Sequence, residues 1–300
     1  MSRGLAPAAG RQGPGPMPGA TVAALDLAFV RRTAGALPGD HRALGVGAGT
    51  ELAQLRPYRV GDDVRQIDPA ASARTGELHV RQHVPERALA TWVILDLSPS
   101  MAFGTTGRLK SDVAEGVVRT VSRLAIRRGG RIGVLTCGSA DQRLLPPRGG
   151  RPALGAVGHL LDEGVCGDGH ADPGALRAAI ERMRRMAVQP GLITVVSDFR
   201  EENLERPLHA LAARHRVLGV EIGDPREEAL PDAGMLAFVD PETGRQVEVD
   251  CSCAAVRDAF AVAEAERRTR VADALRRAGA RHVSLRTDRD WLRELAVGLR

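Results

Sequence analysis

The distribution of apolar residues changes character near residue 90 of the 300-residue chain. Beyond it, continuous apolar runs of strand length alternate with stretches in which apolar residues recur every three or four positions. The strand-like runs cover residues 91–95, 131–137, 192–198 and 216–222, and the helical stretches cover 113–125, 153–161, 175–186 and 204–213. This alternation predicts an α/β fold with a right-handed, doubly wound, mostly parallel sheet.

Before residue 90 the pattern is shorter and more broken. Residues 1–20 are rich in glycine and proline and have little to bury, which predicts a disordered tail. Residues 22–36 have the spacing of a short helix, and residues 77–84 alternate as a half-buried strand does. We therefore expect residues 21–90 to form an N-terminal segment with a β addition.

Further elements are expected towards the C-terminus of the α/β domain, which we place at residues 91–300. Residues 235–250 predict a β-hairpin around a Pro/Gly turn. A long helix over 252–278, a strand over 281–285 and a closing helix over 288–299 follow. Residues 146–152 are expected to form a Gly/Pro loop. The side chains expected to pack the long helix are Val256, Phe260, Ala263, Val271 and Leu275.

Composition narrows the class of protein. An apolar share of 43% supplies a core, and the net charge of +5 comes from interspersed acids and bases, with Lys110 the only lysine. No basic stripe or aromatic platform indicates nucleic-acid binding. No apolar run has the length of a membrane span, and no signal-peptide core is present. We expect a soluble, cytoplasmic protein.

The four cysteines support the same compartment. Cys137, Cys166, Cys251 and Cys253 do not have the spacing of a disulfide framework or of a zinc site. We therefore expect four reduced thiols.

The first candidate site follows the apolar run at 91–95. Asp96, Ser98 and Ser100 place three hard oxygen ligands on one short loop, which suits a magnesium-type ion. At this stage an alternative stays open, in which a serine caps the next helix and Asp96 is a turn residue.

A second strand end strengthens the metal interpretation. The run at 192–198 ends in Asp198. Parallel strands bring their carboxyl ends to the same edge of a sheet, where ligands bind in open α/β folds. Asp96 and Asp198 are therefore expected to face one crevice.

A third feature is the charged segment at 56–69. Its acids Asp62, Asp63 and Asp68 lie close in sequence to Arg65 and Arg74, so we expect bidentate pairs that fix a loop. An active-site acid pair at Asp62 and Asp63 is the less favoured alternative, because the arginines would keep both carboxylates ionised.

Taken together, these motifs resemble a known bacterial family. The stretch from Asp96 to Ser100 resembles the metal-ion-dependent adhesion site of von Willebrand factor A domains. Residues 40–295 resemble domain of unknown function family 58. The resemblance rests on RPYRVGDDVRQID at 56–68, Ser72-Ala73-Arg74, the Asp-x-Ser-x-Ser-Met stretch with Phe103-Gly104, Ser197-Asp198-Phe199 and residues 224–231. In the first of these motifs and its continuation, the structural residues are Arg56, Tyr58, Gly61, Asp62, Asp63, Arg65, Asp68 and Arg74.

The resemblance implies a von Willebrand A-like α/β domain with β additions. It implies that Ser98 and Ser100 bind Mg²⁺ or Mn²⁺ directly, while Asp96 and Asp198 act through waters or hydrogen bonds. It also implies a MoxR-type AAA+ ATPase as partner, together with a client protein, in an adaptor or chaperone-like role.

Two departures from the family pattern stand out. The adhesion site normally takes a threonine from a middle loop, but this chain has His170 there, with Asp172 as a substitute ligand if the site is intact. Imidazole is a poor magnesium ligand. The second departure is Pro69, which stands where the family commonly has tryptophan after the aspartate.

The leading hypothesis is therefore a non-enzymatic interaction module with a Mg-dependent adhesion-type site. A metal-dependent hydrolase or phosphatase is the rival. It would need a nucleophile or base beside the ion, and Ser98 stands where an aspartyl-phosphate enzyme would have a second aspartate. An adaptor with a degenerate, metal-free site is the other alternative.

Overall fold

The computed structural model describes residues 5–6, 10–18, 21–22, 25, 51–84, 90–127, 129–166 and 172–299. The chain divides into two compact units. The larger comprises Met1–Leu37 and Leu89–Arg300, and the smaller comprises Pro38–Ala88. This division differs from the predicted boundaries at residues 21 and 90 in that the described residues up to Leu25 belong to the larger unit.

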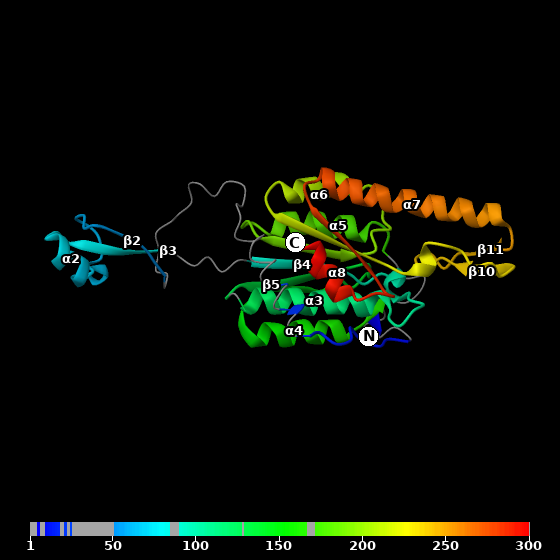
Figure 1. Cartoon of the computed structure of the whole chain (residues 1–300), viewed down its shortest axis with the longest axis horizontal. Helices are drawn as coiled ribbons and strands as arrows, with labels where there is room; N and C mark the ends of the chain where they lie inside the picture. Colours follow the sequence, from blue (N-terminus) through cyan, green and yellow to red (C-terminus); the bar gives the residue numbers. More distant parts are fainter. Residues whose placement is uncertain are drawn as a thin grey trace. The chain divides into compact units, whose positions relative to one another are not determined.

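A six-stranded sheet forms the centre of the larger unit, within its described residues (Figure 1). All neighbouring strands are parallel except β5 and β6, which are antiparallel. This sheet confirms the predicted doubly wound, mostly parallel α/β fold. In spatial order the strands are β12 (Arg281–Arg286), β9 (Arg216–Gly223), β8 (Leu192–Ser197), β4 (Ala90–Asp96), β5 (Arg131–Cys137) and β6 (Leu144–Arg148).

Helices cover both faces of this sheet. Val93 and Leu95 of β4 pack in one hydrophobic cluster, and Trp92 and Ile94 pack in another on the opposite face. Because β4 is buried on both faces, its sequence is continuously apolar. The first cluster involves α3 (Lys110–Arg127), α4 (Gly150–Asp162) and α8 (Trp291–Gly298), and the second involves α5 (Ala175–Met186), α6 (Glu205–Ala212) and the C-terminal part of α7 (Ala254–Arg277).

Strand β6 corrects the prediction of an irregular loop at 146–152. Its residues Pro146 and Pro147 lack amide hydrogens and so indicated a loop. β6 lies at the edge of the sheet, where a strand tolerates prolines because half of its backbone groups need no partner strand. The pairing with β5 is also irregular between Ile132 and Val134.

The N-terminal tail also differs from its prediction. Residues 10–18 lie against the α/β unit, and the amides of Gln12 and Gly13 donate to the Asp112 carboxylate in α3. The Trp291 indole donates to the carbonyl of Pro14 at 2.9 Å. A proline- and glycine-rich segment is thus ordered by hydrogen bonds to side chains distant in sequence. Nearer the N-terminus, β1 (Leu5–Ala6) pairs with β7 (Val165–Cys166).

The predicted hairpin and long helix are present, but they pack less than expected. The hairpin comprises β10 (Met235–Val239) and β11 (Gln246–Asp250), whose side chains are mostly exposed. In α7, Leu275 is buried, whereas Val256 and Phe260 are exposed. The N-terminal half of α7 therefore contributes little to the core.

The smaller unit is described over residues 51–84. β2 (Glu51–Pro57) pairs antiparallel with β3 (His79–Val84). Between them lie a short 3-10 helix, η1 (Val64–Gln66), and α2 (Pro69–Thr75). The β addition is confirmed, with β2 as a strand that the sequence pattern did not reveal.

Two sequence-based expectations concern a helix at 22–36 and the absence of a membrane-spanning segment. Most of the helix expected at 22–36 lies outside the described residues, although Leu25 is helical and buried in the core of the larger unit. Among the helices that the structure describes, none combines the length and apolar character that a bilayer crossing requires.

Candidate functional site

The carboxylate of Asp96 is buried where β4 ends. Its Oδ1 accepts a hydrogen bond from the Ser98 amide at 2.9 Å, and its Oδ2 accepts one from the Ser197 hydroxyl at 2.6 Å. Ser197 is the last residue of β8, so this bond joins two strand ends. A Cβ atom at Gly138, after β5, would collide with the Ser98 amide and Asp96 Oδ1, so glycine is required there.

The two serine hydroxyls of the loop after β4 lie next to each other. Ser98 Oγ and Ser100 Oγ are 3.1 Å apart, and both side chains are buried. A 3-10 helix, η2 (Pro99–Ala102), begins here with Ser98 at its N-cap position, but the Ser98 side chain makes no capping hydrogen bond. The Ser98 hydroxyl therefore faces Ser100 rather than the helix amides.

Asp198 follows β8 and is paired with the only lysine of the sequence. Lys110 Nζ, at the start of α3, donates to Asp198 Oδ2 at 2.8 Å and to Glu227 Oε1 at 2.7 Å. The Lys110 side chain is fully buried. Arg200 lies farther out, 3.7 Å from Asp198 and 3.2 Å from Glu227.

The two strand-end carboxylates consequently differ in acidity. Burial and the charge of Asp198 raise the pKa of Asp96 to about 6, against opposing hydrogen bonds from Ser197 and Ser98. Burial also opposes ionisation of Asp198, but the charges of Lys110 and Arg200 outweigh it and lower the pKa. Asp198 is thus a compensated anion, while the hydrogen-bond donors to Asp96 among its described contacts are neutral.

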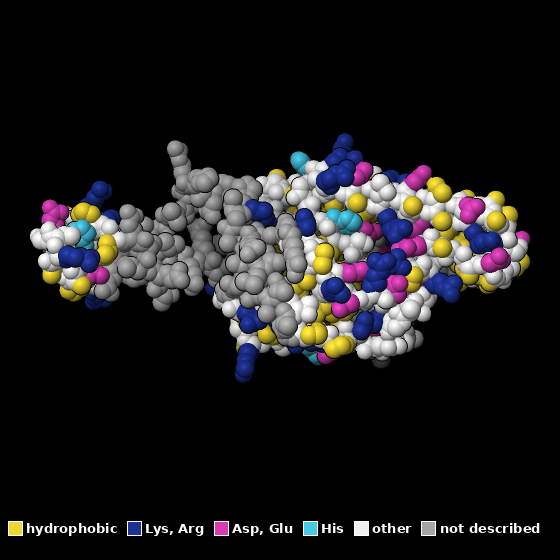
Figure 2. All heavy atoms as spheres, viewed as in Figure 1, with side chains coloured by type: hydrophobic (Ala, Val, Ile, Leu, Met, Phe, Trp, Pro, Cys, Tyr) yellow, Lys and Arg dark blue, Asp and Glu magenta, His cyan; other side chains and the backbone are white. Residues whose placement is uncertain are grey.

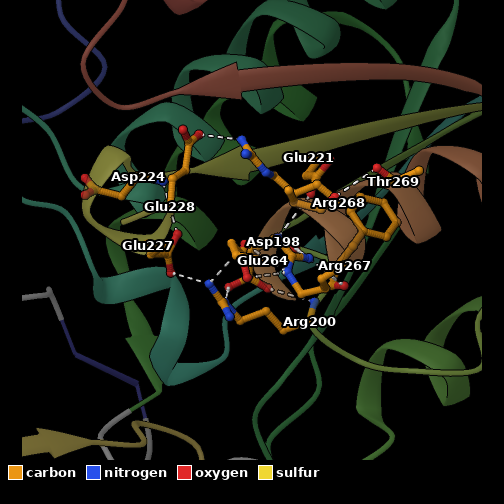
Figure 3. A network of polar contacts seen from close by, with 12 residues as sticks. Asp198, Arg200, Glu221, Asp224, Glu227, Glu228, Glu264, Arg267, Arg268 and Thr269 are labelled. Carbon is orange, nitrogen blue, oxygen red and sulfur yellow. Dashed lines mark hydrogen bonds and ion pairs between the residues drawn. The ribbon is translucent and has the colours of Figure 1, made fainter. Parts of the chain in front are cut away.

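Behind Asp198 the charges continue as a network (Figure 3). Arg200 reaches Glu264 of α7 at 3.8 Å, and Arg267 binds Glu264 at 2.8 Å and Glu221 of β9 at 3.4 Å. On the face seen in Figure 2, acidic and basic side chains are intermingled in the same way. This network ties the loop after β8 to α7.

The loop after β8 also has an unusual backbone. Phe199 has φ = 51°, a left-handed conformation that costs a non-glycine residue about 1 kcal/mol. Its ring is buried, and its amide donates to the Ser197 hydroxyl at 3.0 Å. The packing of Phe199 therefore holds the turn that aims Asp198 at Lys110.

A carboxylate from a distant part of the chain reaches the same loop. Glu242, in the turn between β10 and β11, accepts a hydrogen bond from the Ser100 amide at 3.2 Å. Burial raises the pKa of Glu242, hydrogen bonds from Ser100 lower it, and repulsion from Asp198 raises it further. Three carboxylates thus surround the two serines.

These donors fit a small divalent cation. Ligands of Mg²⁺ at 2.0–2.1 Å on adjacent corners of an octahedron lie about 2.9 Å apart, close to the 3.1 Å between the two hydroxyls. Asp96 is a buried anion without a cationic partner among its described contacts, as a cation site requires. Within the described residues, no group of three or more His, Cys, Asp or Glu side chains is arranged as a metal site.

The middle loop contributes no described ligand to this cluster. His170 lies outside the described residues. Asp172 is described and exposed, and its backbone carbonyl accepts a hydrogen bond from Ala175 at the start of α5. The structure therefore brings together Asp96, Ser98, Ser100 and Asp198, and leaves the Asp172 side chain in solvent.

The charged motif of the smaller unit forms a local scaffold. Arg56 makes the bidentate pair with Asp62, at 2.7 and 2.6 Å, where we expected Arg65 or Arg74. Arg56 lies at the end of β2, six residues before Asp62 in the sequence. Its side chain faces the turn that carries Asp62. Arg65 contributes its amide, which donates to Asp63.

The rest of this motif shapes α2. Asp68 is its N-cap and accepts from the Ala71 amide, and Pro69 occupies the first turn. Gly61 and Gly76 have positive φ. The Tyr58 amide donates to the carbonyl of Leu78. These contacts stabilise the fold of the unit, and Asp62 and Asp63 do not form an isolated acid pair.

Sequence reasoning missed four residues of the candidate site: Ser197, Lys110, Gly138 and Glu242. Lys110 was conspicuous as the only lysine, and Ser197 precedes Asp198 directly. Nothing in the local pattern connected Gly138 or Glu242 to the loop after β4, because both reach it through the tertiary structure.

Comparison with known proteins places the chain in a family. Residues 54–270 match the model of a protein family of unknown function, DUF58. Uncharacterized proteins of Mycobacterium tuberculosis and Mycobacterium bovis are each 39% identical to the chain over 285 residues, covering 92% of it and 87% of the relative.

Three solved structures are similar at low scores. An aerotolerance-related membrane protein of Bacteroides fragilis has a TM-score of 0.44 and 13% identity, covering 70% of this chain and 98% of that one. BatB of Bacteroides thetaiotaomicron has a TM-score of 0.42 and 16% sequence identity, covering 70% of this chain and 95% of that one. The von Willebrand A domain of SpRpn10 has a TM-score of 0.35 and 15% sequence identity, covering 69% of this chain and 93% of that one. At these scores the likeness supports no conclusion about function.

Proposed function

This chain belongs to the DUF58 family of proteins of unknown function, and on that premise we propose that it is a non-enzymatic interaction module that binds an acidic side chain of a partner protein. The binding position is the loop after β4, at the carboxyl edge of the sheet. Open α/β sheets bind ligands at this edge.

The contact between Glu242 and the Ser100 amide carries this proposal. It shows a carboxylate received at the loop despite repulsion from Asp198. Lys110 and Arg200 supply the nearby positive charge. A partner's aspartate or glutamate offers the same chemistry as Glu242.

We propose that Mg²⁺ or Mn²⁺ takes part, held by Ser98 and Ser100 with Asp96 and Asp198 behind them. When bound, the ion would supply a positive charge for the partner's carboxylate. Asp96 would neutralise part of the ion's charge, and Ser197 would keep its carboxylate oriented.

The partner we propose is a MoxR-type AAA+ ATPase acting with a client protein. Support comes from the resemblance of residues 40–295 to a family that commonly accompanies such ATPases. We also propose the cytoplasm as the compartment. In accord with this, none of the four cysteines, which all lie in the described residues, is part of a disulfide.

A metal-dependent hydrolase remains the rival, and the arrangement favours it less. Hydrolysis needs a nucleophile with a general base beside it. Asp96 already accepts from Ser98 and Ser197, and Asp198 accepts from Lys110, so each carboxylate is engaged in holding the loops. Phosphoester turnover that Asp96→Ala abolishes would establish the hydrolase instead.

The direct test has two measurements. Calorimetric titration with MgCl₂ should give binding heat with the wild type and none with Asp96→Ala. Co-purification with the MoxR-type ATPase of the same genome should require Mg²⁺ and fail with Asp96→Ala, while Glu248→Ala, an exposed change on β11, behaves as wild type. ATPase binding that ignores both EDTA and Asp96→Ala would contradict the proposed site.

A further inference from the structure

The hairpin turn places a single acidic side chain on the candidate site. Glu242 is half-buried, while Thr243, Gly244 and Arg245 beside it are exposed. Its carboxylate contacts the Ser100 amide from 142 residues away in the sequence. The tip of the hairpin therefore points one carboxylate inwards and leaves its other side in solvent.

The turn is built to present that carboxylate. Asp240 Oδ1 accepts from the Glu242 amide at 3.0 Å, and its Oδ2 accepts from the Thr243 hydroxyl at 2.6 Å. Backbone bonds from Gly244 to Asp240 and from Asp240 to Arg245 close the loop, and Gly244 supplies the positive φ. These bonds are internal to the turn, so its shape does not depend on the contact with Ser100.

The strands that carry the turn are weakly held. In β11 only Val249 is even half-buried, and Met235, Val239 and Val247 are large exposed apolar residues. The base of the hairpin is anchored, because Cys251 is buried and its amide donates to the carbonyl of Gly234 at 2.7 Å. An anchored base with exposed strands allows the tip to move as one piece.

We infer that Glu242 is an internal ligand of the candidate site, which holds the β10–β11 hairpin over the loop after β4 and must leave before an acidic partner binds. This inference rests on the proposed function, since it assigns the regulation of the same site. The contact is the hydrogen bond from the Ser100 amide at 3.2 Å, made at the tip of a mostly exposed hairpin, so an external carboxylate can exchange with it.

The consequence for affinity follows from competition. When a binding position is open only a fraction of the time, the apparent dissociation constant is the intrinsic constant divided by that fraction. A hairpin closed nine-tenths of the time would weaken partner binding about tenfold. Removing the Glu242 carboxylate should therefore strengthen partner binding by the same factor.

The first experiment measures the hairpin itself. Hydrogen exchange is followed in the full chain for wild type, Glu242→Ala and Glu248→Ala, the last being the control on β11. We expect Glu242→Ala to accelerate exchange in residues 98–103 and 235–250 several-fold and Glu248→Ala to leave it unchanged. Equal exchange in wild type and Glu242→Ala would overturn the inference.

The second experiment measures competition, with a fluorescein-labelled hexaglutamate peptide as probe and hexaglutamine as its control, in MgCl₂. Glu242→Ala should bind hexaglutamate about tenfold more tightly than wild type and Glu248→Ala do. Equal binding by all three would overturn the inference. Accelerated exchange without any hexaglutamate binding would instead support the internal ligand and contradict the proposed acidic partner.

Discussion

The ends of β4 and β8 make an instructive pair. β4 ends at the buried Asp96, and the buried Asp198 follows β8 directly at the same edge of the sheet, where the Ser197 hydroxyl connects the two strand ends. Yet Asp96 has a pKa raised to about 6, while Asp198 has one below its ordinary value. Residue type and burial are shared, so neither explains the difference.

The difference lies in the partners of each carboxylate. Asp198 contacts the buried ammonium of Lys110, whereas Asp96 contacts an amide and a hydroxyl. A full positive charge compensates the desolvation of an anion, and neutral donors compensate only part of it. The negative charge of Asp198 is therefore already compensated within the protein, whereas the negative charge of Asp96 is suited to bind a cation.

The largest expected effect comes from removing the compensating charge. Lys110→Met leaves Asp198 and Glu227 facing each other without the ammonium, which should lower the free energy of unfolding by about 3–5 kcal/mol. Urea unfolding at pH 7 measures this. Arg200→Met is the matched control, since Arg200 is partly exposed and its loss should cost about 1 kcal/mol or less. If Lys110→Met lowers the free energy of unfolding no more than Arg200→Met does, Lys110 does not account for the difference between Asp198 and Asp96.

Neutralising each aspartate should separate the two ends directly. Asp198→Asn breaks a buried ion pair and should cost about 3 kcal/mol. Asp96→Asn removes a buried charge that has no cationic partner among its described contacts, while the amide oxygen can still accept from Ser98, so a change within about 1 kcal/mol is expected. Urea unfolding in EDTA compares the two. Equal losses would show that both carboxylates are compensated alike.

A third strand end isolates the contribution of hydrogen bonds. Asp224 follows β9, and although burial opposes its ionisation, hydrogen bonds from Thr105 and Thr287 lower its pKa. Thr287 Oγ1 donates to Asp224 at 2.6 Å. Thr287→Val keeps the volume and removes that donor, so a loss of about 2 kcal/mol is expected at pH 7.

The pH dependence of that loss has a definite sign. Because the folded pKa of Asp224 is depressed, its stabilisation is present above the unfolded value of about 3.9 and is lost as the pH falls through the folded pKa. Urea unfolding at pH 7, 5, 4 and 3 should show the wild type and Thr287→Val converging at the acid end. If the difference in the free energy of unfolding between wild type and Thr287→Val is the same at every pH, Thr287 stabilises the fold through packing.

The smallest expected effect is that of the ion. If Mg²⁺ binds at the Asp96 end, MgCl₂ at several times the dissociation constant should stabilise the wild type by about 1 kcal/mol. A thermal-shift assay should show this rise, its reversal by EDTA and its absence in Asp96→Asn. A rise that persists in Asp96→Asn would place the bound ion elsewhere in the protein.

The sequence predicted most of the larger unit because its elements have clear local signals. Residues 131–137 and 175–186 were placed with their observed bounds as β5 and α5. The exceptions were segments whose local signal conflicts with their environment. Pro146 and Pro147 fit a strand only because β6 lies at an edge, and residues 10–18 are ordered by tertiary contacts, among them those with Asp112 and Trp291.

The candidate site divides in the same way. The sequence by itself determined that Asp96, Ser98 and Ser100 follow one strand and Asp198 another, because buried strands have a continuous apolar pattern and alternation with helices makes them parallel. Only the tertiary structure decided that Lys110 neutralises Asp198, that Asp96 lacks such a partner among its described contacts, and that Glu242 reaches Ser100. Periodicity reports which side chains are buried, whereas the charge balance of a site depends on which distant side chains are buried together.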